Sequence, residues 1–406
     1  MNACILTIGD ELLQGFTIDT NSSWLGKILH PYGIYINKII TIGDHHDVII
    51  DEAREILVGN YDFLFVTGGL GPTHDDVTKI AFCELFSDEM YLDEEYFDKL
   101  KNKFNSISKN MPEINRSQAM LLKNADVIPN DSGSALGIHY LKNNTHVFIL
   151  PGVPDEMKGM VQNYIIPQYM KNEPFTNQVT IKTAGIMESR LAEKIDALMK
   201  KYSTTFRFAF LPHYNGVSFR MQNKESSKDL QKVKNEFFAA MQPYAYGFDS
   251  ESLESVLAQK LIEKKLTIAT AESCTSGLIG KRLTDVIGSS KYFLGSITAY
   301  SNDLKIELLG VSENTLQTHG AVSEKVALEM AEGIRNNTHA DIGISTTGIS
   351  GPDGGSKSKP QGLVYIGIIT PNISKVKKYI FQVKRHAHRE ITATAALNIT
   401  RLAIEN

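Results

Sequence analysis

Short apolar runs that end in glycine-rich or small polar loops recur along this chain, and they restrict its fold more than any other feature. In the first region the runs read as strands at 3–8, 34–42 and 62–66, separated by helices at 24–29 and 48–57. Strands that alternate with helices predict a parallel sheet covered by helices on both faces. Residues 1–170 are therefore predicted to form an α/β domain.

The alternation restarts near residue 251 and continues to a helix over 390–404, which predicts a second α/β domain at 251–406. Between the two, residues 171–250 predict a small α+β module. Its elements are a strand at 178–183, a helix at 189–200, a hairpin over 205–221 and a helix at 228–241. Three domains agree with the length of 406 residues.

Composition narrows the function classes. A net charge of −4 and a pI near 6.3 give no general attraction to nucleic acid or to acidic membranes. No apolar run approaches the roughly 18 residues of a membrane span, and the N-terminus reads directly into a strand, without a signal peptide. The three cysteines are scattered, which predicts neither a disulfide framework nor a structural zinc site. We expect a cytoplasmic protein with no membrane or nucleic-acid partner.

The stretch 271–277 (Ala-Glu-Ser-Cys-Thr-Ser-Gly) places Ser273 between a short buried strand and a helix. Helix N–H groups that open beside the serine would favour developing negative charge. Tyr300 and Lys305 lie five residues apart across a second strand-to-helix junction, so both can approach one point. These residues outline a Ser/Tyr/Lys hydrolase; the alternative is a helix that merely has a serine at its N-terminus.

Amide hydrolysis by a serine needs a proton acceptor, and Lys305 can serve if it is neutral. Lowering a lysine pKa from about 10.4 to near 7 costs on the order of 4–5 kcal/mol, which burial can supply. Tyr300 would relay or orient the proton. Ser276 stands where an SxxK motif would need lysine, which disfavours a penicillin-binding-protein mechanism. Cys274 is a rival nucleophile, but no histidine is near it in sequence, and a buried packing role is favoured.

The first region carries a second candidate site. Gly68, Gly69 and Gly71 follow a strand and precede a helix, where backbone N–H groups can converge on an anion. Asp75 and Asp76 at the start of that helix suit a divalent cation. Loops that contain Asp10, Asn21 and Ser132 are expected at the same carboxyl edge of the sheet. Together the loops predict a phosphate or nucleotide site, although turn chemistry explains any one of them alone.

Both sets of motifs resemble known domains. The stretch 67–73 with Asp75 and Asp76 resembles the signature of molybdopterin-binding, MoCF-type domains. The stretches 271–275, 300–302 and 348–352, with Lys305, resemble the nicotinamide-nucleotide amidohydrolase domain. Joined in this order through a KH-like module, they resemble the competence/damage-inducible CinA family over essentially the whole chain.

The resemblance implies a bifunctional enzyme of pyridine-nucleotide recycling. The C-terminal domain would deamidate nicotinamide mononucleotide without a cofactor, and the N-terminal domain would hydrolyse ADP-ribose with Mg, Mn or Co. A homodimer is also implied. By resemblance Thr347 is catalytic or orients the substrate, and Gly348 and Gly351 make room for the ligand phosphate. Arg385 and Arg389 are candidates for binding that phosphate, because guanidinium groups match phosphate oxygens. At the nucleotide site the loops described above supply the expected substrate-binding residues: Gly68, Gly69, Gly71, Asp10, Asn21 and Ser132.

Three alternatives stay open. The middle module has no Gly-x-x-Gly between helices, the element with which KH domains clamp nucleic acid, so an architectural role is favoured. The N-terminal domain could bind a pterin or nucleotide without hydrolysing it, because a fold and a loop do not determine the reaction. The chain could also act mainly as a regulatory partner in DNA uptake, which its lack of basic, aromatic-rich patches disfavours.

Overall fold

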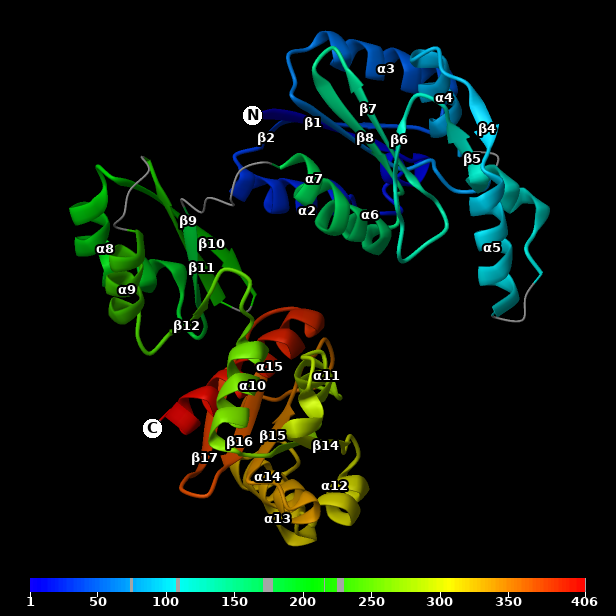
Figure 1. The fold of residues 1–406 in the computed structure, drawn as a ribbon. Coiled ribbons are helices and arrows are strands. Elements are labelled where there is room, and N and C mark those ends of the chain that lie inside the picture. The colour runs from blue at the N-terminus through cyan, green and yellow to red at the C-terminus, as the bar shows by residue number, and fades with distance from the viewer. Residues whose placement is uncertain (74–75, 107–109, 171–177, 215, 225–229, 406) are drawn as a thin grey trace. The chain divides into compact units, whose positions relative to one another are not determined.

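The computed structural model describes residues 1–73, 76–106, 110–170, 178–214, 216–224 and 230–405. The chain forms two compact units, Met1–Thr176 and Asn177–Asn406 (Figure 1). The second unit contains both the middle module and the C-terminal domain.

The first unit is built on a sheet with the strand order β2-β1-β3-β8-β7-β6. β2, β1, β3 and β8 are parallel, as predicted, whereas β7 pairs antiparallel with both β8 and β6. The reversal follows from Asn143 and Asn144, which join β7 to β8 with φ values of 51° and 66°. Positive φ at both turn residues is hairpin geometry that asparagine tolerates, so the sheet is mixed. The strands are β1 (Asn2–Ile8), β2 (Tyr35–Ile42), β3 (Phe63–Thr67), β6 (Asp126–Ile128), β7 (Gly137–Lys142) and β8 (Thr145–Leu150).

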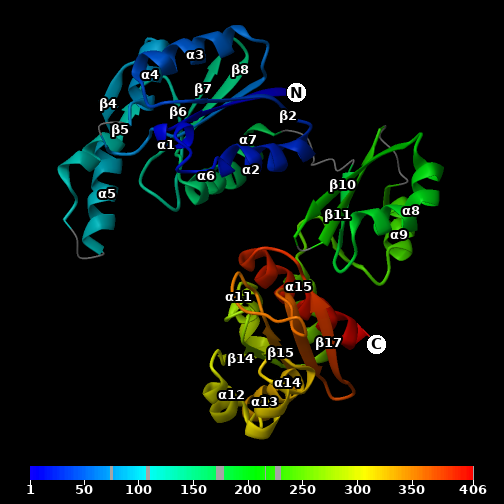
Figure 2. The ribbon, with the colours of Figure 1, turned by 180° about the vertical axis from the view of Figure 1, so that it is seen from behind.

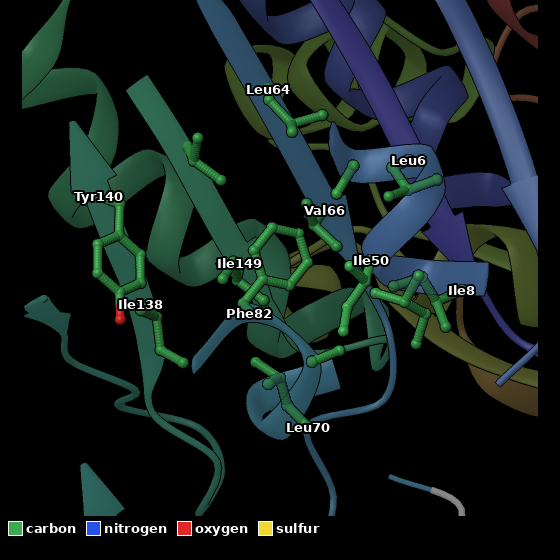
Figure 3. Close-up of a cluster of buried hydrophobic side chains, with 14 of the residues drawn as sticks. Leu6, Ile8, Ile50, Leu64, Val66, Leu70, Phe82, Ile138, Tyr140 and Ile149 are labelled. Atoms are coloured by element: carbon green, nitrogen blue, oxygen red, sulfur yellow. The ribbon is translucent and has the colours of Figure 1, made fainter. Parts of the chain in front are cut away.

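Helices cover both faces of this sheet. α3 and α4 pack on one face and α2 and α6 on the other (Figure 1). Leu6, Ile50 and Phe82 belong to the core beneath α3 and α4 (Figure 3). The remaining elements of the unit complete its order: α1 (Asp10–Leu13), α2 (Thr20–Leu29), η1 (His30–Tyr32), α3 (His46–Val58), α4 (Thr78–Leu85), β4 (Met90–Leu92), α5 (Glu94–Ser106), η2 (Glu113–Ala119), β5 (Met120–Leu122), α6 (Pro154–Met160), η3 (Val161–Ile165) and α7 (Ile166–Tyr169).

The middle module has an antiparallel sheet with the order β10-β11-β9-β12. Its core joins Phe219 of the sheet to Leu191 of α8 and Phe237 of α9. The predicted α+β module is therefore confirmed. Its elements are β9 (Gln178–Thr183), α8 (Glu188–Tyr202), β10 (Phe206–His213), β11 (Gly216–Asn223), α9 (Leu230–Ala240) and β12 (Ala245–Phe248).

The C-terminal domain has a sheet with the order β14-β13-β15-β16-β17, in which β14, β13 and β15 are parallel. One core lies between this sheet and α10, α11 and α15, and another lies toward α14 (Figure 2). The predicted α/β class is confirmed. The elements are α10 (Leu253–Lys264), β13 (Ile268–Glu272), α11 (Leu278–Thr284), η4 (Ser289–Lys291), β14 (Phe293–Thr298), α12 (Asn302–Leu309), α13 (Glu313–His319), α14 (Glu324–Thr338), β15 (Ile342–Gly348), β16 (Leu363–Ile369), β17 (Ser374–Ile380) and α15 (Arg385–Glu405).

β15 continues through Gly348 because the segment pairs antiparallel with β16, so Thr347 lies in a strand. One boundary differs from the sequence prediction. α15 begins at Arg385, five residues before the predicted start; its first turn contains Arg385, His386 and His388 and therefore lacks the apolar periodicity that indicates a helix in the sequence.

Among the described helices, none has both the length and the apolar character needed to cross a bilayer.

Candidate functional sites

Ser273 lies at the carboxyl edge of three adjacent parallel strands. Glu272, the last residue of β13, pairs with Thr298 of β14 and with Thr346 of β15. The Ser273 backbone N–H then donates to the Thr346 carbonyl at 3.0 Å. Neighbouring strands are about 4.8 Å apart, so the residues that follow β13 and β14 and the end of β15 share one edge. The fold thus brings the Tyr300 loop and Thr347 to the Ser273 turn.

The N–H groups of Ile279 and Gly280 in the first turn of α11 are not free beside Ser273, contrary to the sequence expectation. The Glu272 carboxylate is fully buried and accepts from the backbone N–H of Ile279 at 3.1 Å and of Gly280 at 2.8 Å. Hydroxyls of Thr270 and Ser296 lie 3.3 Å from the same carboxylate. The negative charge of the Glu272 carboxylate stabilises the positive end of the α11 dipole. Through its hydrogen bonds to α11, Glu272 fixes the turn that carries Ser273. Sequence reasoning missed this role of Glu272. The available signal was a glutamate placed directly before a turn and a helix, where a negative charge is favourable.

The Ser273 hydroxyl makes no hydrogen bond to any residue that the structure describes, and the residue is 9% exposed. The neighbouring Cys274 thiol is buried in the core below the sheet, and burial raises its pKa to about 12. Because the thiolate is the nucleophilic form, Cys274 is poorly suited to attack at neutral pH. The geometry therefore favours the serine over the cysteine.

Lys305 is 1% exposed and lies on α12. Its Nζ donates to the backbone carbonyls of Ala299, Tyr300 and Ser301 at 2.8, 3.0 and 3.3 Å. Burial lowers the pKa of Lys305 because it removes the ammonium from water. The three carbonyls oppose that effect, since each accepts a proton of the charged form. Lys305 thus holds the loop that carries Tyr300, with its pKa lowered from the ordinary 10.5 by burial.

Arg385 connects two loops of the site. Its Nη1 donates to the Gly351 carbonyl at 3.0 Å, and its Nη2 lies 3.4 Å from the Tyr300 hydroxyl. Tyr300 is 61% exposed and, within the described chain, its hydroxyl contacts neither Ser273 nor Lys305. Gly351 has φ +69°, and a Cβ there would lie 1.9 Å from Gln361 Nε2. Glycine is therefore required for the fold of this loop.

Thr347 and Gly348 complete β15 at the same edge. The buried Thr347 hydroxyl donates to the Ala321 carbonyl at 2.7 Å, so its proton is committed to the backbone. A Cβ on Gly348 would lie 2.8 Å from the Leu363 carbonyl oxygen, so this glycine is explained by strand packing. Thr347 can still accept a hydrogen bond from a substrate.

α15 contributes Arg389 and His388 to the edge. Arg389 Nη2 donates to the Thr275 carbonyl at 3.0 Å, and its buried Nε has no partner among the described residues. His388 Nε2 lies 3.1 Å from the Gly362 carbonyl, which can only accept, so Nδ1 accepts from the Ser350 hydroxyl at 3.0 Å. His388, which sequence reasoning missed, thus links the Gly351 loop to α15.

Replacing His388 with alanine is expected to lower the free energy of unfolding by about 1–3 kcal/mol, because the Gly362 carbonyl and the Ser350 hydroxyl lose a buried partner. Burial lowers the pKa of His388 below its unfolded value near 6.5, so the unfolded state binds the proton more readily. The contribution is present above pH 6.5 and is lost as the pH falls through the folded-state pKa. Denaturant unfolding at pH 5 and pH 8 checks this; an equal effect at both values would contradict it.

The N-terminal glycine loop packs tightly against the sheet edge. A Cβ on Gly68, at φ +115°, would lie 2.1 Å from the Ile8 carbonyl oxygen. A Cβ on Gly69, at φ +65°, would lie 2.1 Å from Thr78 Oγ1. Both glycines are thus required by backbone geometry, and the loop lies where β1, β3 and β8 end in register.

Three buried polar atoms of the first unit have no partner within the described residues: Asn21 Oδ1, Ser22 Oγ and Thr78 Oγ1. Asn21 Nδ2 donates to the Gly152 carbonyl at 2.9 Å, and a Cβ on Gly152 would lie 3.5 Å from the Gly68 Cα. Asn21 and Thr78 therefore flank the glycine loop. Buried polar groups are nearly always satisfied, so orphaned atoms here indicate that a ligand or water completes the site.

The carboxylates of this site are only partly described. Asp75 lies outside the described residues. Asp76 Oδ2 accepts from the backbone N–H of Thr73 at 2.9 Å and from its hydroxyl at 2.5 Å, and a Cβ on Gly71 would lie 2.5 Å from the same oxygen. Asp10 donates its backbone N–H to the Asp44 carboxylate at 2.9 Å. Ser132 is exposed in a turn whose N–H groups bond the Asn130 side chain, and no described contact links it to the glycine loop.

The folds define a multidomain α/β protein in which a serine turn and a glycine loop lie at the carboxyl edges of two different sheets. Three family profiles match it: the CinA C-terminal domain over residues 250–404, the "Probable molybdopterin binding domain" over 4–171 and the damage-inducible protein CinA KH domain over 178–247. The chain belongs to the CinA family.

Relatives match along the full length. A CinA-like protein of Chloroherpeton thalassium is 40% identical over 415 aligned positions, covering 99% of both chains. A CinA-like protein of Dictyoglomus thermophilum is 36% identical and covers 100% of both. Among solved structures, the competence/damage inducible protein CihA from Agrobacterium tumefaciens is 36% identical, covers 38% of this chain and 98% of its own, and has a TM-score of 0.35.

Proposed function

We propose that the C-terminal domain hydrolyses the amide of nicotinamide mononucleotide to give nicotinate mononucleotide and ammonia, with Ser273 as the nucleophile. The observation that carries this proposal is the Ser273 hydroxyl, unpartnered among the described residues, at a strand edge shared with a buried lysine and two arginines. No cofactor is required, because a serine ester intermediate divides amide hydrolysis into two steps.

In the first step Ser273 Oγ attacks the amide carbon and its proton passes to a base. The C–N bond then breaks, ammonia leaves with a proton, and a Ser273 ester remains. Water hydrolyses the ester to the carboxylate and restores the serine. The backbone N–H groups of Ser276 and Gly277 have no acceptor among the described residues, so they are candidate donors to the oxyanion.

Lys305 is the proposed base. Its lowered pKa supports a neutral amine. If the amine moves away from the backbone carbonyls that it contacts, it can accept the proton of the Ser273 hydroxyl. Tyr300 would orient the substrate or relay the proton from the exposed side of the site. The guanidinium groups of Arg385 and Arg389 suit the phosphate of the mononucleotide, because a planar fork of donors matches phosphate oxygens. Arg389 contributes a buried donor without a described partner.

At the N-terminal site we propose hydrolysis of ADP-ribose, in which water adds across the diphosphate to give AMP and ribose 5-phosphate. The glycine loop would hold the phosphates, with Asn21 and Thr78 beside them. A divalent cation would bind together with the diphosphate, because Mg²⁺ is often held by one or two carboxylates plus substrate phosphates. Asp76 would supply one carboxylate oxygen. The described residues contain no preformed group of three metal-binding side chains. The cation would neutralise phosphate charge.

The metal dependence gives a direct test. ADP-ribose cleavage is expected to stop in excess chelator and to recover when Mg, Mn or Co is added. Asp76→Asn should shift the metal concentration for half-maximal activity upward, by about tenfold, because one anionic ligand is lost. Asp131→Asn, in the exposed turn beside Ser132, is the matched control. Undiminished hydrolysis in chelator would show that no metal is needed.

The alternative for the N-terminal domain is binding of a pterin or nucleotide without hydrolysis. The molybdopterin-binding family match favours it. Calorimetry with ADP-ribose, run beside the cleavage assay, separates binding from turnover.

A regulatory role in competence is suggested by the description of the Agrobacterium relative. Our proposal includes a homodimer in the cytoplasm without nucleic-acid contact, and size-exclusion chromatography with light scattering tests the dimer.

A further inference from the structure

The second unit contains a cavity of about 840 Å³ that neither proposed activity uses. It lies between the middle module and the face of the C-terminal sheet that α15 covers. None of the predicted catalytic or substrate-binding residues lines it. Its volume is within the range of about 300–1,000 Å³ that is usual for small-molecule sites.

One wall of the cavity is an apolar stripe along α15. Ile391, Ala395 and Ile399 are four residues apart and therefore lie on one side of the helix. All three are only half-buried, whereas their neighbours at 392–394 and 396–398 are buried; of these, Thr394 and Asn398 also line the cavity. Tyr379 and Phe381, at and just beyond the end of β17, extend the apolar surface. Ala395 and Ile399 also pack against the C-terminal core, so the stripe borders both that core and the cavity.

The opposite wall belongs to the middle module and is held in place. It includes Met187, Pro212 and Pro243. The Pro243 carbonyl accepts from Nη2 of Arg401, a fully buried α15 residue, at 2.7 Å. Ala184 at the end of β9 is buried within the C-terminal core. These contacts tie both walls together, so the cavity is largely pre-formed.

Charge at the rim is asymmetric. Lys375 and Lys377 are exposed and alternate with Tyr379 along β17, so all three lie on one face of that edge strand. Glu188 is the one carboxylate among the lining residues that the structure describes. Lys378 lies on the other face of β17, with its Nζ 5.9 Å from the Tyr365 ring centre. The rim therefore favours an anion above an apolar floor.

We propose that this cavity binds an amphiphilic carboxylate, whose apolar chain lies along α15 and whose carboxylate meets Lys375 and Lys377. The paired cations select for the anion, and the stripe of Ile391, Ala395 and Ile399 selects for the chain. This site is separate from the proposed amidase and pyrophosphatase sites, so its test does not depend on either activity.

Titration of the full chain with dodecanoate by isothermal calorimetry tests the proposal. We expect saturable binding of one molecule per chain. Ala395→Trp, which fills the cavity, should weaken it more than about tenfold. Lys375→Ala and Lys377→Ala should each weaken it about two- to fivefold, the usual range for exposed ion pairs, while the matched control Lys378→Ala leaves it unchanged. Dodecanol should bind more weakly than dodecanoate by a similar factor.

Absence of saturable binding would overturn the proposal, as would dodecanoate binding that Lys375→Ala and Lys378→Ala affect equally. The two lysine variants alter exposed side chains, so they remain informative if Ala395→Trp does not fold. A second copy of the chain could instead cover the cavity. In that case dodecanoate would not bind, and Met187→Glu would dissociate the dimer on size-exclusion chromatography.

Discussion

Replacing Ser273 with alanine is expected to reduce ammonia release from nicotinamide mononucleotide by at least about 10³-fold, because no ester can form without the hydroxyl. The side chain makes no described hydrogen bond and lies at the end of β13, so the fold should survive the change. Initial rates in a coupled ammonia assay, with circular dichroism as a check on folding, measure the effect.

Cys274→Ala is the matched control for Ser273→Ala. Burial raises the pKa of this thiol to about 12 and the side chain packs in the core, so the variant should retain most of the activity while losing some stability. Loss of activity in Cys274→Ala, together with survival in Ser273→Ala, would reverse the assignment of the nucleophile.

Lys305→Met is expected to lower the deamidation rate by about 10²- to 10⁴-fold, the usual contribution of a general base. In the unmodified chain kcat/KM should rise with pH, because the neutral amine is the active form and burial places its pKa below the ordinary 10.5. The pH profile of kcat/KM for nicotinamide mononucleotide measures this pKa.

A second variant separates catalysis by Lys305 from support of the loop. Lys305→Arg keeps N–H donors for the carbonyls of Ala299 and Tyr300 but cannot lose its proton. If Lys305 is the base, the arginine variant stays inactive and its rate no longer rises with pH. Recovery of more than a tenth of the activity in a folded arginine variant would make Lys305 a positioning residue.

The order of the strands and helices was readable from the sequence because both α/β domains repeat buried runs and loops at a regular spacing. The hairpin of β10 and β11 lies close to its predicted position at 205–221. The extension of β15 through Gly348 was not predictable, since it depends on pairing with β16, which is distant in sequence. The early start of α15 was missed because Arg385 and its neighbours are polar.

The candidate sites, too, were predictable only in part from the sequence. Motifs located Ser273, Lys305 and the glycine loop, because those residue types are informative on their own. They could not show that the Glu272 carboxylate bonds the α11 N–H groups, or that Lys305 bonds three carbonyls. His388 and the cavity beside α15 were also invisible, since each depends on contacts between segments far apart in the chain.

The most direct test of the central claim is to incubate the purified full-length chain with nicotinamide mononucleotide and, separately, with ADP-ribose, each with and without chelator. We predict equal amounts of ammonia and nicotinate mononucleotide from the first substrate in both conditions, and AMP with ribose 5-phosphate from the second only when metal is present. No ammonia from nicotinamide mononucleotide in either condition would contradict the proposed function of the Ser273 site.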